Sequence, residues 1–341
     1  MINQEHSITR QDVVNEISKG AMKGRNINIK TATQKHFAPI NIALLKYWGK
    51  RNEELKLPTT SSLSMTMPEY GTTTQIVKSE NDTDEVVLKD ICIDKQSSFY
   101  VKVVEYLDLF RCCFEDKNKY KIITYNNIAT ASGLASSASG FGALVLAIND
   151  LYNLELDGKN LSILARLGSG SACRSVCGIE EKNKFVIWHK GVMENGMDSF
   201  AEPVAEPMYN LPDFAKNIKI KIVEVSNEKK SISSTEAMRK TIEKSNALLQ
   251  QGKQSKYQQW IKQTEQDLVD IFNTTNFNEF GEIVERNALM MHYAIQEAGI
   301  NYFLPETLDI IKTIQENRKL GIKNEYFTID AGANIKVLSL G

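Results

Sequence analysis

Ala129-Thr-Ala-Ser-Gly-Leu-Ala-Ser-Ser-Ala-Ser-Gly-Phe-Gly142 runs directly into the apolar segment 143–148 and reads as a small-residue loop that opens a helix. A turn around Gly133 lets backbone N–H groups approach an anion, and the first helical turn adds unpaired donors and a positive dipole end. Ser136, Ser137 and Ser139 crowd that turn, where hydroxyls cap a helix, contact phosphate or help hold magnesium. The stretch predicts a phosphate site; the alternative is a serine-capped core helix.

The chain's size and charge limit what it does. Its 341 residues, 42% of them apolar, suffice for one large or two ordinary domains, and we favour two. The 41 basic and 42 acidic residues leave a formal charge of −1. Nothing in this balance indicates a nucleic-acid groove or a basic membrane face. Anionic ligands must therefore be bound by local groups.

The cysteines and the amino terminus indicate a compartment. The five cysteines are odd in number and lack the paired spacings of a disulfide or zinc framework, which favours a reducing cytoplasm. Residues 1–10 are polar and mixed in charge, and no segment approaches the roughly 20 apolar residues of a membrane span. We expect an untargeted, soluble, cytoplasmic protein. The histidines are interpreted as structural, and no metal ligands are assigned.

A second unusual stretch spans residues 37–52. Lys46, Tyr47, Trp48, Lys50 and Arg51 place polar or cationic tips beside two large aromatics, directly after an apolar run that contains a proline. In a chain without a basic excess, this concentration favours an anion site. The alternative is a solvated surface turn with ordinary lysines.

A third stretch, Gly168-Ser-Gly-Ser-Ala-Cys-Arg-Ser175, is another turn of small residues. It carries a single guanidinium, Arg174. An arginine among glycines and serines is suited to bidentate hydrogen bonding with a carboxylate or a phosphate. The alternative is that Arg174 caps the carboxyl end of a helix.

Periodicity gives a coarse order of elements. Thr9 is expected to cap a short helix in an amino-terminal appendage of residues 1–26. We then predict a strand at 27–32, a loop becoming a strand over 57–67 with 72–77 as its partner, a hairpin at 85–94, a helix through 101–110 and a strand at 120–125. Residues 161–167 are expected to be helical.

In the second half of the chain, residues 185–188 and 201–204 read as short strands around a loop at 191–199. An alternating strand at 218–225 is expected to begin the second domain. Helices follow over 233–298 with breaks near Gly252 and Asn276, then a helix at 305–320 and a strand pair at 326–330 and 335–340. Strands, then helices, then strands indicate an α+β fold.

Several segments resemble a known family. Ser132-Gly-Leu-Ala-Ser-Ser-Ala138 is similar to the phosphate loop of the GHMP kinase superfamily. Residues 38–51, 168–175 and 330–334 resemble signature segments of the diphosphomevalonate decarboxylases, and further similarity at 57–62, 198–199, 233–235 and 291–292 extends the likeness over residues 30–341. The resemblance implies an amino-terminal domain like ribosomal protein S5 domain 2 (27–205) and a ferredoxin-like carboxy-terminal domain (206–341).

The resemblance also implies a reaction and its residues. Family members use ATP and Mg²⁺ to convert mevalonate 5-diphosphate to isopentenyl diphosphate, ADP, phosphate and CO2. Asp330 matches the carboxylate that faces the 3-hydroxyl, Lys46 the neutralising cation, and Arg174 the group that holds the substrate carboxylate. The remaining matches are Tyr47, Lys50, Ser169, Ser171 and Ser199 for the substrate, and Gly133, Ala135, Ser136 and Ser137 for ATP.

Other interpretations stay open at this point. A phosphomevalonate decarboxylase needs the same Asp330, Lys46 and Arg174; a mevalonate-type kinase would phosphorylate without decarboxylation; and a non-catalytic relative would only bind a nucleotide or metabolite. Lys50 and Tyr47 favour the diphosphate. By family likeness we expect a homodimer. The chain stops at Gly341, earlier than the family pattern, so the second domain is expected to be shortened, with an edge strand in question.

Overall fold

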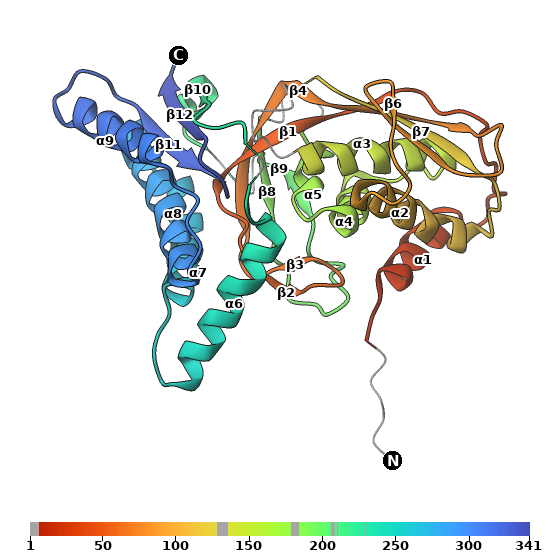
Figure 1. Ribbon diagram of the computed structural model, residues 1–341, viewed down its shortest axis with the longest axis horizontal. Coiled ribbons are helices and arrows are strands. Elements are labelled where there is room, and N and C mark those ends of the chain that lie inside the picture. The colour runs from red at the N-terminus through yellow and green to blue at the C-terminus, as the bar shows by residue number, and fades with distance from the viewer. Residues whose placement is uncertain (1–6, 128–135, 179–183, 206–208, 210, 229) are drawn as a thin grey trace.

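The computed structural model describes residues 7–127, 136–178, 184–205, 209, 211–228 and 230–341. These residues form two halves, each with a sheet and helices (Figure 1). In the first half, α2, α3 and α4 cover one face of a seven-stranded sheet; in the second, helices pack beside a three-stranded sheet. The α+β prediction is confirmed.

The first half begins with α1 (Arg10–Ala21) and continues with nine short and long strands and four helices in the described segments. The strands are β1 (His36–Leu45), β2 (Lys50–Asn52), β3 (Leu57–Pro58), β4 (Ser62–Lys78), β5 (Glu85–Leu88), β6 (Ile91–Cys92), β7 (Tyr120–Asn126), β8 (Phe185–Trp188) and β9 (Ala201–Pro203). The helices are α2 (Ser98–Phe114), α3 (Ser136–Leu151), α4 (Gly158–Gly168) and α5 (Ala172–Ser175). The sheet order is β6-β5-β7-β4-β8-β9, with β1 also paired to β4.

The expected partnership of residues 57–67 with 72–77 is wrong. Residues 62–67 and 72–77 belong to one long strand, β4, while Leu57 and Pro58 form β3, and β1 pairs antiparallel with residues 63–67 and 71–74 of β4. The register shifts between Pro39 and Ile40, where proline has no N–H for the ladder and β4 bends. Gly71 lies opposite Pro39, and a Cβ there would be 2.3 Å from the Ala38 carbonyl oxygen. The hydroxyl-rich stretch that looked like a hairpin is thus a bent central strand.

The strand expected at 27–32 does not form. Only Ala32 makes an isolated bridge, to Val77 at the end of β4. The Lys30 amide instead donates to the Leu151 carbonyl at the end of α3, and Ile27 is exposed. Alternating polar and apolar residues over this short range did not suffice for a strand, because the Lys30 N–H bonds to the end of α3 and not to a neighbouring strand.

The amino-terminal helix forms as predicted but is not detached. Thr9 caps α1, and Asp12 completes a capping box. Val13, Val14 and Ile17 are buried in the main hydrophobic core, and α1 packs on α2 and α4. Burial of three apolar side chains makes this helix part of the first half's core.

Packing fixes the helices around the predicted phosphate loop. Within the described part of the loop region, α3 begins at Ser136 and its Ala143, Val145 and Ile148 are buried. Tyr106 on α2 meets Phe141 edge-on at 5.3 Å between ring centroids, and its hydroxyl donates to the Leu164 carbonyl of α4. The three helices are therefore held together beside the start of α3.

The second half follows the predicted order. Its elements are a 3-10 helix (Asp213–Asn217), β10 (Ile218–Val223), α6 (Ser234–Gln250), α7 (Lys256–Phe272), α8 (Phe277–Glu297), α9 (Pro305–Lys319), β11 (Tyr326–Ile329) and β12 (Ile335–Leu340). The sheet order is β10-β12-β11, so β12, the last described strand, is central. Gly281 of α8 lies so close to the Tyr326 ring that a Cβ would sit 2.2 Å from it.

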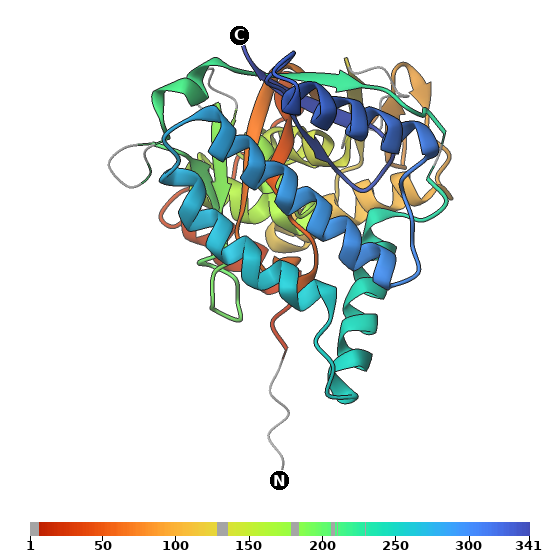
Figure 2. The ribbon, with the colours of Figure 1, turned by 90° about the vertical axis from the view of Figure 1, so that its left-hand side faces the viewer.

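The two halves meet along β1 and β4. Figure 2 shows α7 and α8 crossing in front of these strands. Leu44 and Leu63 from the first half share a core with Phe280 and Leu338 from the second. Because Asp330 follows β11 directly, this packing brings the end of the chain against the turn after β1.

Candidate active site

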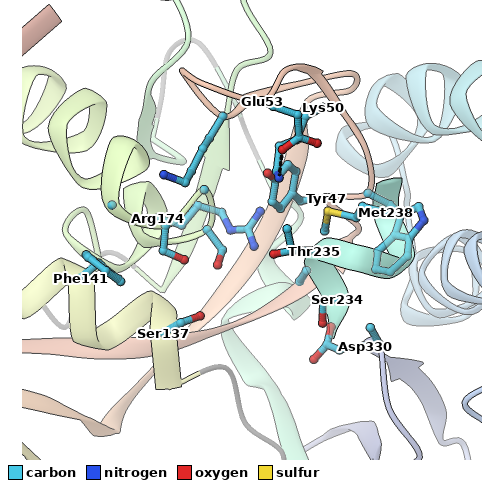
Figure 3. A pocket seen from close by; sticks show the side chains of 18 of the residues that line it. Tyr47, Lys50, Glu53, Ser137, Phe141, Arg174, Ser234, Thr235, Met238 and Asp330 are labelled. Atoms are coloured by element: carbon cyan, nitrogen blue, oxygen red, sulfur yellow. Dashed lines mark hydrogen bonds and ion pairs between the residues drawn. The ribbon is translucent and has the colours of Figure 1, made fainter. Parts of the chain in front are cut away.

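A cavity of about 560 Å³ lies where the two halves meet (Figure 3). Its lining comes from the starts of α1, α3 and α6, from α2, from the turn after β1, from the turn before α5 and from the end of β11. The sequence-predicted residues that line it are Lys46, Tyr47, Lys50, Ser137, Ser169, Ser171, Arg174 and Asp330. The cavity therefore brings together four segments that are distant in sequence.

Asp330 lies between two ammonium groups. Its Oδ1 is 2.7 Å from Lys46 Nζ and its Oδ2 is 3.0 Å from Lys336 Nζ. Burial alone raises the pKa of this carboxyl, but the charges of Lys336 and Lys46 outweigh it and hold the pKa well below its usual range. The side chain remains 35% exposed. The cavity thus contains a fixed, ionised carboxylate.

Lys46 is fixed on three sides. Its Nζ also donates to the Ala43 carbonyl at 2.8 Å, and its backbone N–H donates to Asn287 Oδ1 of α8 at 2.9 Å. Burial lowers the pKa of Lys46 to about 8, against the raising effect of Asp330. The ammonium is therefore poorly hydrated and aimed at Asp330, which suits it to neutralise charge that develops nearby.

Arg174 is held by neutral groups. Its Nε donates to Asn41 Oδ1 at 3.0 Å and its Nη1 to Ser62 Oγ at 2.5 Å. The guanidinium carbon lies 5.8 Å from the centroid of the Trp188 ring. Among the described residues, none accepts a hydrogen bond from Nη2, and Figure 3 shows the guanidinium pointing into the cavity. Its charge remains available for an anionic ligand.

Tyr47 and Lys50 form another part of the wall. The Tyr47 ring packs on Trp188 at 4.6 Å, and its buried hydroxyl has no partner in the described part of the chain. A buried hydroxyl without a partner is costly, so this atom is suited to a ligand. Lys50 Nζ lies 2.5 Å from Glu53 Oε2, as the dashed line in Figure 3 shows.

The predicted phosphate loop is described only in part. Ser136 begins α3, and Ser137 lines the cavity. Gly133 and Ala135 lie outside the described residues. The helix start still points its first turn toward the space beside Arg174 and Asp330, as Figure 3 shows for Ser137.

Ser199 is not brought to this cavity. It is fully buried, accepts a hydrogen bond from Trp188 Nε1 at 3.2 Å and donates to the His189 carbonyl at 3.0 Å. Both hydrogen bonds join the ends of the 191–199 loop and leave the hydroxyl inside the protein. The structure thus places Ser199 outside the lining of the cavity, hydrogen-bonded to Trp188, against which the Tyr47 ring packs.

Sequence reasoning missed the residues that support the site. Lys336 is buried and pairs with Asp330, while Asn41 and Ser62 position Arg174. From α6, Ser234, Thr235 and Met238 also line the cavity. A lysine inside an otherwise apolar strand was the one available signal for Lys336, because such a side chain needs an anionic partner if it is buried.

A second cavity of about 330 Å³ adjoins the first at Ser137, Phe141 and Lys102, which line both. Most of its other walls are apolar, including Val86, Leu88, Phe99, Val103, Ile122 and Leu144. The start of α3 therefore separates a charged compartment from an apolar one. An extended ligand with a charged and an uncharged end fits such a pair.

The described residues contain no group of three or more His, Cys, Asp or Glu side chains placed to hold a metal ion. Across the same residues, every helix is too short or too polar to cross a lipid bilayer.

The chain is similar to proteins of known family along most of its length. A family model of the diphosphomevalonate decarboxylase-like N-terminal domain matches residues 38–201, and one of the mevalonate 5-diphosphate decarboxylase C-terminal domain matches residues 220–340. The diphosphomevalonate decarboxylase of Debaryomyces hansenii is 34% identical over 312 residues, which cover 87% of this chain and 76% of that protein.

Solved structures give the same result. Mevalonate diphosphate decarboxylase from Staphylococcus aureus superposes with a TM-score of 0.78 at 30% identity, covering 91% of this chain and 88% of the other. A structure described as MDDEF in complex with MVAPP, AMPPCP and magnesium gives a TM-score of 0.77 at 37% identity, covering 91% and 89%. These likenesses confirm the predicted two-domain GHMP kinase fold. With both halves matched in sequence and in structure, the chain belongs to the diphosphomevalonate decarboxylase family.

Proposed function

We propose that this protein decarboxylates mevalonate 5-diphosphate at the expense of ATP, yielding isopentenyl diphosphate, ADP, phosphate and CO2. The observation that carries the proposal is the meeting of Asp330, Lys46 and Arg174 in one cavity. A carboxylate, an ammonium and a free guanidinium edge are the groups that this reaction needs at one carbon centre. Family membership supports the same activity.

In the phosphorylation step, Asp330 orients the tertiary 3-hydroxyl and accepts its proton as the oxygen–phosphorus bond forms. Burial raises the pKa of the Asp330 carboxyl, but the charges of Lys336 and Lys46 outweigh burial and hold the pKa well below its usual range. The carboxylate is therefore a weak base. Alignment therefore contributes more than basicity, as in other phosphoryl transfers. Lys46 neutralises negative charge on the transferring group.

In the fragmentation step, Arg174 holds the substrate carboxylate through the guanidinium edge that Asn41 and Ser62 leave free. The bond between this carboxylate and its neighbouring carbon breaks, and its electron pair becomes the new carbon–carbon double bond. The bond between the third carbon and the phosphorylated oxygen breaks at the same time, and phosphate takes that electron pair. Arg174 thereby aligns the carbon–carbon bond whose cleavage releases CO2.

The nucleotide fits the two adjoining cavities. We place the base in the apolar cavity and the phosphates at the start of α3, near Ser136 and Ser137, with Gly133 and Ala135 completing the loop by family likeness. Mg²⁺, when bound, would offset the negative charge of the phosphates. Since the described residues offer no complete set of metal ligands, phosphate oxygens and a few side chains such as Ser137 would hold the ion.

The diphosphate end of the substrate fits the opposite wall. Tyr47, Lys50, Ser169 and Ser171 line this part of the cavity, and the unpartnered Tyr47 hydroxyl is a suitable donor to a phosphate oxygen. The turn at 168–171 lies close to the Tyr47 side chain because Gly170 has no side chain of its own; a Cβ there would lie 2.6 Å from Tyr47 Oη.

The direct test is an assay of purified protein with Mg–ATP and either mevalonate 5-phosphate or mevalonate 5-diphosphate, following ADP and CO2 together. We expect equal amounts of ADP and CO2 from the diphosphate and much less from the monophosphate. ADP without CO2 would instead identify a kinase. Absence of both products would leave only a binding function.

Three further features complete the proposal. The domain boundary lies near residues 205 and 206, supported by family matches that end at 201 and resume at 220.

The protein acts in the cytoplasm, in keeping with five cysteines that are all free of disulfides. It acts as a homodimer, on family likeness alone, which sedimentation at several protein concentrations would test.

A further inference from the structure

Helix α1 precedes residue 38, where the family match begins, yet it reaches the cavity. Arg10, its first residue, lines the cavity together with Lys50 and Lys56. The mechanism above uses Lys50 but neither Arg10 nor Lys56. Arg10 is therefore a cationic side chain at the cavity that lies before the residues matched by the family model.

Arg10 is held in place by both its helix and its neighbour. Its backbone N–H and its Nε donate to Glu54 Oε1 at 3.3 and 3.2 Å. The buried Val14 and Ile17 anchor the same helix in the core. In the part of the chain that the structure describes, neither Nη atom of Arg10 has an acceptor. One edge of the fork is thus free and preorganised.

Arg10, Lys50 and Lys56 line the same cavity. Lys56 Nζ donates to the Leu167 carbonyl at the end of α4. Burial, followed by the charges of Arg10 and Lys50, lowers the pKa of Lys56 to about 8. Figure 3 shows Lys50 and Glu53 at the end of the cavity away from Asp330. Arg10 and Lys50 each pair with one carboxylate here, Glu54 and Glu53, and Lys56 adds a third cation to the lining.

We propose that Arg10 binds the terminal phosphate of the substrate diphosphate, with Lys56 beside it, and so favours the diphosphate over the monophosphate. This rests on the proposed function and extends it to a residue of the added helix. A guanidinium fork matches two phosphate oxygens. The terminal phosphate binds the free Nη edge of the Arg10 guanidinium while Glu54 continues to hold Nε, and a monophosphate lacks the group that would reach this edge.

The test compares Arg10→Gln with wild type on both substrates. We expect KM for mevalonate 5-diphosphate to rise about tenfold, the loss of roughly one charge-assisted hydrogen-bonding pair, with kcat and the KM for ATP nearly unchanged. The KM for the monophosphate should stay the same. Arg10→Lys should recover part of the affinity. Lys19→Gln, an exposed change in the last turn of the same helix, is the matched control.

Glu54→Gln separates phosphate binding from mere bracing of the loop. If Arg10 binds phosphate, this variant changes the KM for the diphosphate much less than Arg10→Gln does, because the guanidinium with its free Nη edge remains and α1 still anchors it. If Arg10 only braces residues 53–56, Glu54→Gln reproduces the loss seen in Arg10→Gln, and the inference is wrong. An unchanged KM in Arg10→Gln also overturns it. Calorimetric binding of mevalonate 5-diphosphate without ATP gives the same comparison independently of turnover, so it distinguishes failure here from failure of the proposed reaction.

Discussion

Asp330 is the residue on which the proposed chemistry depends most directly. Replacing it with Asn keeps the shape but removes the charge that Lys46 and Lys336 face. We expect Asp330→Asn to lower kcat by about a thousandfold or more, since proton acceptance and alignment are both lost. Affinity for ATP should change little, because the nucleotide is placed at the start of α3.

The measurement is single-turnover release of CO2 and ADP, with nucleotide binding followed separately by calorimetry. A variant with near-normal turnover would remove Asp330 from the mechanism. A variant that fails to bind ATP would indicate that the carboxylate organises the nucleotide site instead.

Lys336 gives a pH-dependent prediction. Its ammonium is among the charges that hold the pKa of Asp330 below the usual range, against desolvation that raises it. Lys336→Met removes that charge, so the pKa of Asp330 rises and the carboxylate is protonated at a higher pH. As pH falls, activity should therefore be lost earlier in the variant than in wild type.

The profile of kcat against pH from the acid side to neutrality tests this. Lys221→Met, an exposed change on the adjacent strand β10, is the control and should leave the acid limb in place. Loss of activity at every pH without displacement of the acid limb would mean that Lys336 has only a packing role.

At the scale of elements, α1 provides a stability prediction. Ile17 is 5% exposed and belongs to the main core, so Ile17→Ala leaves a cavity in contact with the rest of that core. We expect the free energy of unfolding to fall by about 2–4 kcal/mol. Ile27→Ala, in the stretch that failed to become a strand, removes a side chain that is 48% exposed and should cost less than about 0.5 kcal/mol.

Urea unfolding followed by far-UV circular dichroism measures both changes. Equal effects of the two substitutions would show that α1 is only loosely attached. A larger effect of Ile17→Ala supports the structure, in which the helix unfolds together with the first half.

Most elements were predictable because their signals are local. Caps, glycine breaks and periodicity placed the helices from 98 to 114 and from 234 to 319, and the hairpin around Lys89 and Asp90 formed as expected, with positive φ at both residues. The pairing of β4 was not predictable in this way. Its two ends look like separate strands, and only the register with β1 shows that they are continuous.

The residues of the candidate site also divide into those with a sequence signal and those without one. Asp330, Lys46 and Arg174 were found because they stand in segments that resemble a family, and the structure gathers them in one cavity. Lys336 was missed because β12 is the middle strand of its sheet and is buried from 335 to 338, so polar and apolar positions do not alternate. Ser199 resembles a family residue but lies outside the cavity lining, and similarity of sequence does not give the direction of a hydroxyl.

For the whole molecule, the interface between the halves positions the cavity. The Thr328 hydroxyl donates to the Ala43 carbonyl at 3.2 Å, and the Lys46 backbone donates to Asn287, whose own Nδ2 donates to Thr264 Oγ1 and Asp267 Oδ2. Asn287 therefore links the catalytic turn of one half to two helices of the other. Its burial makes each of these hydrogen bonds hard to replace with water.

Asn287→Ala tests whether this link joins the halves into one unit. The change leaves the Lys46 amide buried without its partner, so we expect the free energy of unfolding to fall by about 2 kcal/mol or more. We also expect a lower kcat, since Lys46 is no longer held against Asp330. Asn273→Ala, at an exposed helix end, should do neither. Calorimetric unfolding of both variants should show one transition, shifted down only in Asn287→Ala. Two separate transitions, with only the later half affected, would mean that the halves unfold independently and that the cavity does not depend on this contact.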